Sequence, residues 1–389
     1  MKILQLTDDL PPHILGGSGR IVWETAKGLL SRRHEISILT AAPRDAFPIS
    51  AEEIRIHTIP RRNERWAHYR SVFSRSVEKE VMSVIDEVKP NIIHAHGTAW
   101  HTGYRWIGAA CARNIPCIFT MHGVMHVSYG KVTGHETSLF LKDLLRARWT
   151  MNPLRNVTIR KMLGQCNALL AVSEALRSYA AKYGYPQTKV LRNGIDLLFW
   201  KSGTSKEQAR TQLRLPQNVP LFLFAGRIGY DKGTDVLLKS LPSSAHLLVC
   251  GGGDTTSLKV LGDRFHFLSS QNPEQMRILY AACDAALVPS VYLDPFPTVC
   301  LEAMACGRPV LATTEGGAKE SVIDGITGWV RDPIDTATWR TQLEWCCAHR
   351  SEMQTMEHIC REHMEEHFSI DRYLDELLEV YNQCRMSGS

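Results

Sequence analysis

The sequence of 389 residues contains no apolar run that approaches the roughly 20 residues needed to cross a membrane. Its first residues, MKILQLTDDLPP, become acidic and contain proline before the apolar core of a signal peptide could form. We therefore expect a cytoplasmic protein. No internal repeat is present, which excludes solenoids and other repeat architectures.

Cysteine is present but has no metal-binding or disulfide pattern. The eleven cysteines are scattered, without a C-x-x-C spacing, and only Cys346 and Cys347 are adjacent. This arrangement argues against a disulfide framework and against a zinc site. We expect reduced thiols that are mostly buried.

Charge is unevenly distributed along the chain, whose net charge is +5. Residues 1–195 carry 27 Lys and Arg against 15 Asp and Glu, a net charge of +12, whereas the remainder carries 18 against 25, a net charge of −7. A basic half suits an anionic partner such as a lipid phosphate, a membrane surface or a nucleic acid; a solvated basic surface is the alternative. No zinc-finger, RNP-type or helix-turn-helix pattern accompanies the charge, so we expect no nucleic-acid partner.

Short apolar segments alternate with helix-period segments, which predicts the α/β class with parallel sheets and crossover helices. The length and the 44% hydrophobic content suit two domains. Two series of strands are predicted: KILQLT, EISILT, NIIHAH, CIFTM and ALLAVS, then LFLFAG, HLLVCGGG, FHFL, AALVPS and PVLATT. We expect an N-terminal domain of residues 1–195 and a C-terminal domain of residues 196–369, connected by the polar segment 201–220.

Two acids bracket a predicted helix start in the second domain. The apolar run Ala285–Pro289 breaks into a loop that carries Asp294, and the following helix carries Glu302, with seven residues between the two acids. A helix start binds anions because its N–H groups are unpaired and the positive end of the helix dipole lies there. Carboxylates on both sides of a phosphate suit a nucleotide sugar, in which a diphosphate joins two polyhydroxyl groups.

This segment resembles the acid-x7-acid motif of the retaining glycosyltransferases of family 4. The resemblance implies the GT-B fold: two Rossmann-like parallel-sheet domains that face each other across a cleft, with the last helix, about 370–386, packed back on the first domain. The EAMACGRPVLAT and GG..E elements match as well. The chain has Asp294 where the family usually has Glu, and Pro297 where it usually has Gly. Because Asp is one methylene shorter, we expect a different reach toward the donor sugar.

The loop GRIGYDKG supplies two cations for a diphosphate. Arg227 directly follows a predicted strand, and Lys232 lies five residues further in a loop bounded by glycines, so both side chains can reach one diphosphate. The spacing matches the leaving-group site of the family. By resemblance, Asp294 holds a hydroxyl of the donor sugar and Glu302 the ribose. The expected donor-binding residues are Gly16, Gly17, Asn193, Gly226, Pro295, Phe296, Thr298 and Glu302.

Four histidines lie at strand ends of the first domain: His94 and His96 close the predicted strand NIIHAH, and His122 and His126 follow CIFTM. No carboxylate or cysteine stands near them at ligand spacing, so we expect hydrogen bonding rather than metal binding. By resemblance, His122 in the TMHG element lies beside the transferred sugar. With Arg227, Lys232 and Asp294 it makes up the predicted catalytic residues. His96 and, in the glycine-rich loop region, Arg20 are expected on the acceptor side. For His94 and His126 a purely structural role at a strand end remains open.

The sequence contains no D-x-D motif, which other glycosyltransferases use to hold a divalent metal. Arg227, Lys232 and the backbone amides around Gly16 and Gly17 can stabilise the leaving diphosphate instead, so we expect no metal and no cofactor. By resemblance, the sugar keeps its anomeric configuration through front-face attack. A sugar-nucleotide epimerase of the same fold and a noncatalytic nucleotide-sugar-binding scaffold are the alternatives.

A basic amphipathic segment points to the acceptor. Trp66, Tyr69, Phe73 and Val77 recur at helical spacing among arginines, which suits a membrane surface or a lipid-phosphate acceptor; a packed helix with a solvated basic face is the alternative. We expect a sugar or lipid-linked sugar as acceptor, in polysaccharide or glycolipid assembly of the bacterial type. The protein is then either free in the cytoplasm or peripheral on the inner face of the membrane.

Overall fold

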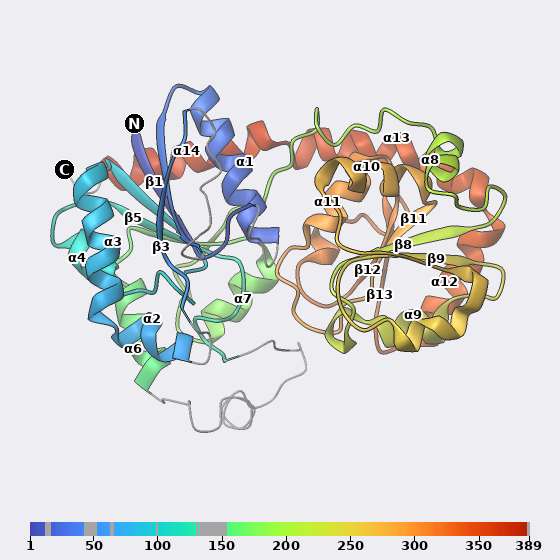
Figure 1. The fold of residues 1–389 in the computed structure, drawn as a ribbon, viewed down its shortest axis with the longest axis horizontal. Coiled ribbons are helices and arrows are strands. Elements are labelled where there is room, and N and C mark those ends of the chain that lie inside the picture. Colours follow the sequence, from blue (N-terminus) through green and yellow to red (C-terminus); the bar gives the residue numbers. More distant parts are fainter. Residues whose placement is uncertain are drawn as a thin grey trace. The chain divides into compact units, whose positions relative to one another are not determined.

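The computed structural model describes residues 1–11, 17–42, 53–62, 66–98, 100–129, 132 and 154–386. The chain divides into two compact units, Met1–Gly194 with Ile370–Ser389, and Ile195–Ser369 (Figure 1). Each unit contains one sheet whose strands are all paired in parallel. The predicted α/β class with two parallel sheets is confirmed.

Unit 1 contains a seven-stranded sheet in the order β3-β2-β1-β4-β5-β6-β7. Its strands are β1 (Lys2–Thr7), β2 (Glu35–Ala42), β3 (Arg55–Pro60), β4 (Ile92–His96), β5 (Cys117–Met121), β6 (Ala168–Ala171) and β7 (Lys189–Val190). Its helices are α1 (Gly17–Ser31), α2 (Ala67–Phe73), α3 (Arg75–Val88), α4 (Trp106–Cys111), α6 (Leu154–Leu163), α7 (Glu174–Lys182) and α14 (Ile370–Met386).

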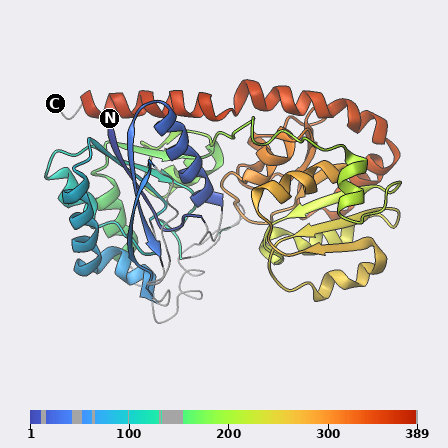
Figure 2. The same ribbon diagram turned by 45° about the horizontal axis from the view of Figure 1, so that its top comes forward.

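The last helix of the chain completes the core of unit 1. Leu374, Leu377 and Tyr381 of α14 are buried in one cluster with apolar residues of α1 and of the sheet, and the ribbon shows α14 crossing α1 (Figure 2). Gly28 allows this close packing, because a Cβ there would lie 2.4 Å from Cδ1 of Leu374. Unit 1 is therefore built from both ends of the chain.

Unit 2 contains a six-stranded sheet in the order β10-β9-β8-β11-β12-β13. Its strands are β8 (Leu221–Ala225), β9 (His246–Cys250), β10 (Phe265–Leu268), β11 (Ala285–Val288), β12 (Val310–Thr313) and β13 (Gly328–Arg331). Its α-helices are α8 (Lys206–Gln212), α9 (Thr234–Ser240), α10 (Pro273–Ala282), α11 (Thr298–Ala305), α12 (Thr336–Ala348) and α13 (Arg350–His367), and its 3-10 helices are η3 (Tyr230–Lys232), η4 (Thr256–Arg264) and η5 (Ala318–Glu320).

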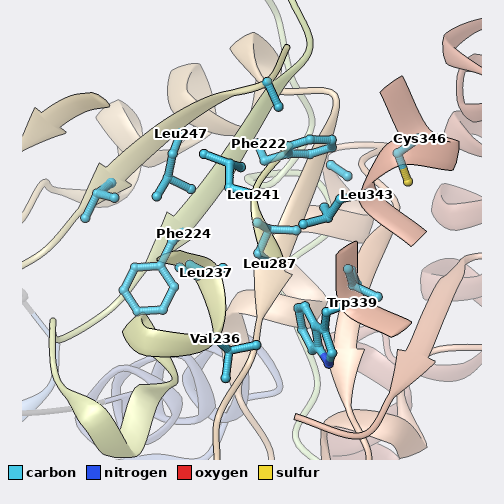
Figure 3. Packing of buried hydrophobic residues seen from close by; sticks show 14 of the residues in the cluster. Phe222, Phe224, Val236, Leu237, Leu241, Leu247, Leu287, Trp339, Leu343 and Cys346 are labelled. Atoms are coloured by element: carbon cyan, nitrogen blue, oxygen red, sulfur yellow. The ribbon is translucent and has the colours of Figure 1, made fainter. Parts of the chain in front are cut away.

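Apolar strands of unit 2 pack against α9 and α12 to form its core. Phe222, Leu287 and Trp339 lie in this cluster with little or no exposed surface (Figure 3). Burial on this scale explains why the strands are short continuous apolar runs rather than alternating patterns. All eleven cysteines are free and eight of them are buried, as the scattered spacing predicts.

Two expectations about local structure are wrong. The segment 201–220 is not a connection between domains, because it lies within unit 2 and contains α8, whose Arg210 is buried and donates to Asp284 at 2.9 Å. The basic amphipathic segment is not one helix either. It breaks at Ser74, which caps α3 by accepting a hydrogen bond from the amide of Val77.

Strand order reverses once in each sheet, between β1 and β4 in unit 1 and between β8 and β11 in unit 2. The loops after two such strands leave in opposite directions, which opens a crevice outside their carboxyl ends, where ligands of doubly wound sheets bind. Residues after β1, β4, β8 and β11 are therefore the first candidates for a functional site.

We predict that Leu377→Ala destabilises unit 1 by about 2–5 kcal/mol, because it removes a fully buried side chain and leaves a cavity between α14 and the sheet. Urea denaturation would measure the change. Glu379→Ala, on the exposed side of the same helix, should change the free energy of unfolding by less than about 0.5 kcal/mol. Equal effects of the two substitutions would contradict the packing described for α14.

Candidate functional site

An ion pair lies at the carboxyl ends of β8 and β11 in unit 2. Lys232 Nζ is 2.6 Å from Asp294 Oδ2, and Ser290 Oγ donates to the same oxygen at 3.1 Å. Asp294 is 5% exposed. The structure thus brings together two of the predicted catalytic residues, one from each loop at the switch point.

Glycines allow the two loops to come this close. Gly233 has a φ of +76°, and a Cβ there would lie 1.9 Å from the carbonyl oxygen of Pro289, so only glycine lets the loop after β8 lie against the end of β11. Gly316 has a φ of +69°, and its Cβ would lie 2.2 Å from the carbonyl oxygen of Asp294. The GG..E element therefore supports the backbone of Asp294, which also accepts from the amide of Gly317 at 2.8 Å.

Lys232 keeps its positive charge at neutral pH. Burial alone would lower its pKa, but the neighbouring Asp294 and Tyr292 outweigh this effect, and the pKa is raised. Nζ lies 5.1 Å from the ring centroid of Tyr292. Burial and the nearby Asp294 also raise the pKa of Tyr292, which therefore remains a neutral phenol.

Arg227 does not join this pair. Its side chain is 54% exposed, and Nη2 lies 2.5 Å from Asp231 Oδ2 in the same loop. The preceding Gly226 contacts the loop after β9, where a Cβ on Gly251 would lie 1.9 Å from the carbonyl oxygen of Gly226. The glycine at 226 is thus part of the backbone packing at the end of β8.

The start of α11 carries the remaining predicted donor residues. Pro297 precedes Thr298, the first residue of the helix, and no side chain caps this start. Glu302 is buried and accepts a hydrogen bond from Tyr280 Oη at 2.8 Å. Phe296 packs with its ring centroid 5.9 Å from that of Phe368, and the adjoining Pro295 is only partly buried. Phe296 is therefore a packing residue.

A cavity of about 160 Å³ opens outside the carboxyl ends of β1, β4 and β5 in unit 1. It is lined by Thr7, Asp8, Asp9, Ser18, His96, Gly97, Trp100, Tyr104, Phe119, Met121, His122, Gly123, Met125 and His126. Three of the four histidines singled out in the sequence line this cavity. The fourth, His94, lies instead between α14 and β5, with its ring nitrogens 2.8 Å from Tyr381 Oη and 2.7 Å from Thr120 Oγ1. His94 is a structural residue.

Two histidines in the cavity are hydrogen-bonded to each other. His96 Nδ1 lies 3.1 Å from His122 Nε2, and the rings are stacked with centroids 5.4 Å apart. Burial lowers the pKa of His122 to about 4 and holds the pKa of His96 well below its usual value. Both imidazoles are therefore neutral at physiological pH, and each can donate one hydrogen bond and accept another. His96 Nε2 is buried without a partner.

Two acids that the sequence analysis did not single out follow β1. Asp8 is buried and accepts from the backbone amides of Trp100, His101 and Thr102, and Asp9 Oδ1 lies 2.9 Å from Arg61 Nη2. The only signal in the sequence is the pair of acids directly after a strand. Asp8 holds the loop after β4 against the cavity.

The other predicted residues of unit 1 lie at the start of α1 and near residue 194, where the first segment of the unit ends. Gly17 is the first residue of α1, and Arg20 in its first turn is partly buried; Gly16 lies outside the described residues. Asn193 is buried next to Gly194, the end of the first segment of unit 1. Within the described ranges, no group of three His, Cys, Asp or Glu side chains is placed to hold a metal ion.

Two family models match consecutive parts of the chain. The model of glycosyl transferases group 1 matches residues 205–361, and the model of Glycosyltransferase Family 4 matches residues 15–198. A D-inositol 3-phosphate glycosyltransferase of Gordonia bronchialis is 26% identical over 96% of this chain and 85% of its own length.

Solved structures share the fold at low sequence identity. Sucrose-phosphate synthase from Thermosynechococcus elongatus has a TM-score of 0.81 at 21% identity and covers 99% of both chains. Anabaena HepE in complex with UDP-glucose has a TM-score of 0.71 at 20% identity and covers 98% of this chain and 99% of its own. With two parallel sheets, and with matches to both family models over most of its length, the chain belongs to glycosyltransferase family 4 and has the GT-B fold.

Proposed function

We propose that this chain is a retaining glycosyltransferase that moves a sugar from a nucleoside-diphosphate sugar to an acceptor hydroxyl group without a metal ion. The observation that carries the proposal is the partly buried ion pair of Lys232 and Asp294 outside the carboxyl ends of β8 and β11. A cation and an acid at a switch point suit a ligand that carries both a diphosphate and sugar hydroxyls.

The donor is proposed to bind to unit 2. Lys232 and Ser290 both donate to Oδ2 of the Asp294 carboxylate, so Oδ1 can accept from a sugar hydroxyl. Lys232 Nζ and the uncapped start of α11 offer positive charge to the diphosphate. Arg227 can add a second cation once it exchanges Asp231 for a phosphate oxygen. UDP-glucose in the structure of Anabaena HepE supports a donor of this chemical class.

These groups would act on the step in which the bond between the anomeric carbon and the diphosphate breaks. Negative charge then develops on the leaving phosphate, and a fixed cation in a site of low dielectric stabilises that charge more than it does in water. Front-face attack lets the leaving phosphate take the proton of the acceptor hydroxyl, so no side chain has to act as a general base.

The acceptor is proposed to bind in the cavity of unit 1. Neutral His122 offers a hydrogen bond to an uncharged hydroxyl, and its partner His96 fixes the orientation of its ring. The relative named as a D-inositol 3-phosphate glycosyltransferase supports a polyol or sugar as the acceptor class. A carrier lipid on that sugar and a place in polysaccharide or glycolipid assembly are part of the proposal.

Exposed apolar side chains support a peripheral membrane association. In the described part of the chain, no helix has the length and apolar character of a membrane span. Trp66 and Tyr69 are about half exposed at α2, as are Leu154 and Val157 on α6, which contacts α2. Arginines and a lysine lie on the same helices, including Lys161. This combination of aromatic, aliphatic and basic groups suits an anionic lipid surface.

We predict that Lys232→Ala lowers turnover of the matching nucleotide sugar by about 10²–10³, because it removes the partly buried cation that the leaving diphosphate meets. The assay would follow release of nucleoside diphosphate and formation of glycoside, with EDTA present. Lys239→Ala, on the exposed part of α9, is the control and should keep full activity. Product formation at the normal rate by the Lys232 variant would refute the site. Sugar inversion without any acceptor would identify an epimerase instead.

We predict that Asp294→Asn makes donor binding sensitive to alkaline pH. Without the carboxylate, burial dominates and lowers the pKa of Lys232. The lysine then becomes neutral at a lower pH than in the unsubstituted protein. Because a neutral lysine no longer attracts the diphosphate, donor binding is lost at that pH. Titration of UDP, GDP or ADP between pH 7 and 10 would measure this. Asp294→Glu, which restores the acid usual in the family, should keep the pH-independent affinity. An unchanged pH profile in the Asn variant would show that Asp294 does not control Lys232.

We predict that the protein binds vesicles of anionic phospholipid and that the double variant Trp66→Ala, Tyr69→Ala reduces this binding several-fold, since it removes the exposed aromatic side chains at α2. Co-sedimentation at low and high salt would measure it. Val260→Ala removes a still more exposed apolar side chain from unit 2 and should have no effect. Vesicle binding that survives the double substitution would exclude α2 as the contact surface.

A further inference from the structure

A second cavity lies within unit 2, between helix α12 and β13, the last strand in the order of the sheet. Its volume is about 400 Å³, which is in the range of roughly 300–1,000 Å³ that is typical of small-molecule sites. It is lined by Trp329, Arg331, Thr338, Thr341, Gln342 and Trp345. These residues differ from those of the candidate site after β8 and β11, so a ligand of this cavity would be distinct from the donor.

Two indole rings give the cavity a flat apolar wall. Trp329 on β13 and Trp345 on α12 have ring centroids 5.4 Å apart and planes at 63° to each other. Trp329 is 5% exposed and belongs to the core of unit 2, whereas Trp345 is only partly buried. The ring of Trp345 also stacks on His349 at 4.5 Å, which fixes its orientation. Rigid aromatic surfaces of this kind suit the C–H face of a sugar ring or the face of a nucleobase.

The polar groups of the cavity carry no net charge. Arg331 Nη1 lies 2.8 Å from Asp324 Oδ1, and Nη2 donates to Gln342 Oε1 at 2.7 Å. Because Asp324 compensates the charge of Arg331, an anion gains less here than at an unpaired cation. Thr341, which is exposed on α12, adds a hydroxyl group. A guanidinium, a carboxamide and a hydroxyl group beside aromatic rings suit an uncharged ligand that is rich in hydroxyl groups.

The outer edge of β13 is closed to a peptide. The amide of Val330 donates to Asp324 Oδ1 at 2.9 Å, and its carbonyl oxygen accepts from Arg331 Nη1 at 2.8 Å. The carbonyl oxygen of Gly328 accepts from the amide of Gly325 at 2.8 Å. A peptide that added to the sheet as a further strand would need these same backbone groups. The edge therefore disfavours a peptide partner and leaves a small ligand as the occupant.

One short loop separates the cavity from the candidate site. The carbonyl oxygen of Arg331 accepts from the amide of Thr314 at 3.1 Å. From Thr314 the chain leads directly to Gly316 and Gly317, whose backbone supports Asp294. A ligand held at Arg331 would therefore be bound to the same unit as the proposed donor.

We propose that this cavity is a second carbohydrate-binding site, which holds an uncharged sugar unit of a glycan. Trp345 is the ring on which the sugar stacks, and Arg331 and Gln342 are hydrogen-bonding partners of its hydroxyl groups. The site takes no part in the transfer step and instead retains a glycan on the protein. The inference goes beyond the proposed function and needs from it only that the chain acts on sugars. A nucleoside could stack on the same ring, and the experiment tells the two ligand classes apart.

The test exposes the full chain to an array of neutral gluco-, manno- and galacto-oligosaccharides and measures the affinity of each retained sugar by titration calorimetry. We expect Trp345→Ala to weaken the binding of at least one of them about tenfold or more, because the stacking surface is lost. Trp345→Phe keeps an aromatic ring and should weaken it less. Retention of no oligosaccharide, or affinities that Trp345→Ala leaves unchanged, would overturn the inference.

A second variant tests the cavity if Trp345→Ala does not fold. Thr341 is exposed on α12, so Thr341→Arg should fill the cavity without disturbing the core and weaken binding of the same oligosaccharide about tenfold or more. Thr355→Arg introduces the same side chain at an exposed position of α13 outside the cavity and should leave the affinity unchanged. Full affinity in Thr341→Arg, or an equal loss in both arginine variants, would refute the site.

Two further outcomes identify the ligand class and separate this inference from the proposed function. Binding of uridine, adenosine or guanosine that is lost in Trp345→Ala, without binding of any oligosaccharide, would show base stacking and contradict the assignment to sugars. Nucleotide-sugar turnover without Trp345-dependent glycan binding would sink this inference alone. Trp345-dependent glycan binding in a chain that does not bind nucleotide sugars would sink the proposed function and leave the carbohydrate site standing.

Discussion

The close approach of two loops at the reversal of strand order in unit 2 is the constraint on which the candidate site depends. A side chain at position 233 would collide with the backbone of Pro289, and one at position 316 would collide with the backbone of Asp294. Both glycines have positive φ values, so no other residue fits without strain. Lys232 and Asp294 can form their ion pair of 2.6 Å only because these backbone segments are in contact. The geometry of the candidate site thus depends on the two positions, 233 and 316, that have no side chain.

The two units present different electrostatic environments to their ligands. In unit 2 a charged lysine is held by an acid, so its positive charge is stable to high pH. In unit 1 burial keeps His96 and His122 neutral, so the ring pair suits hydroxyl groups better than anions. Such a division suits a reaction between a charged leaving group and an uncharged nucleophile.

Much of the fold and part of the site could be predicted from the sequence. Apolar runs of four to six residues identified most of the strands of both sheets, because strands buried on both faces leave a strong local signal. The pairing of Lys232 and Asp294 was within reach for the same reason, since residues that follow neighbouring parallel strands meet at one edge. The GG..E element was recognised, but its task of supporting the Asp294 backbone required coordinates.

Contacts made by single side chains could not be predicted. The sequence of the loop GRIGYDKG does not show whether Arg227 faces a ligand or pairs with Asp231. The aspartate is only four residues away, so either arrangement is open to the side chain. Phe296 follows an acid and a proline and is predicted from the sequence to bind the donor, yet it packs on Phe368 from a distant segment.

The return of α14 to unit 1 has a consequence for the order in which the protein folds during synthesis. Residues 195–369 form a continuous unit, so this unit can fold as soon as its own segment has left the ribosome. Unit 1 begins earlier but lacks the apolar face of α14 until the final residues are added, and the surfaces of α1 and of the sheet that α14 covers remain open until then. The unit that is synthesised first is therefore completed last, and premature termination near residue 370 leaves a finished unit 2 attached to an unfinished partner.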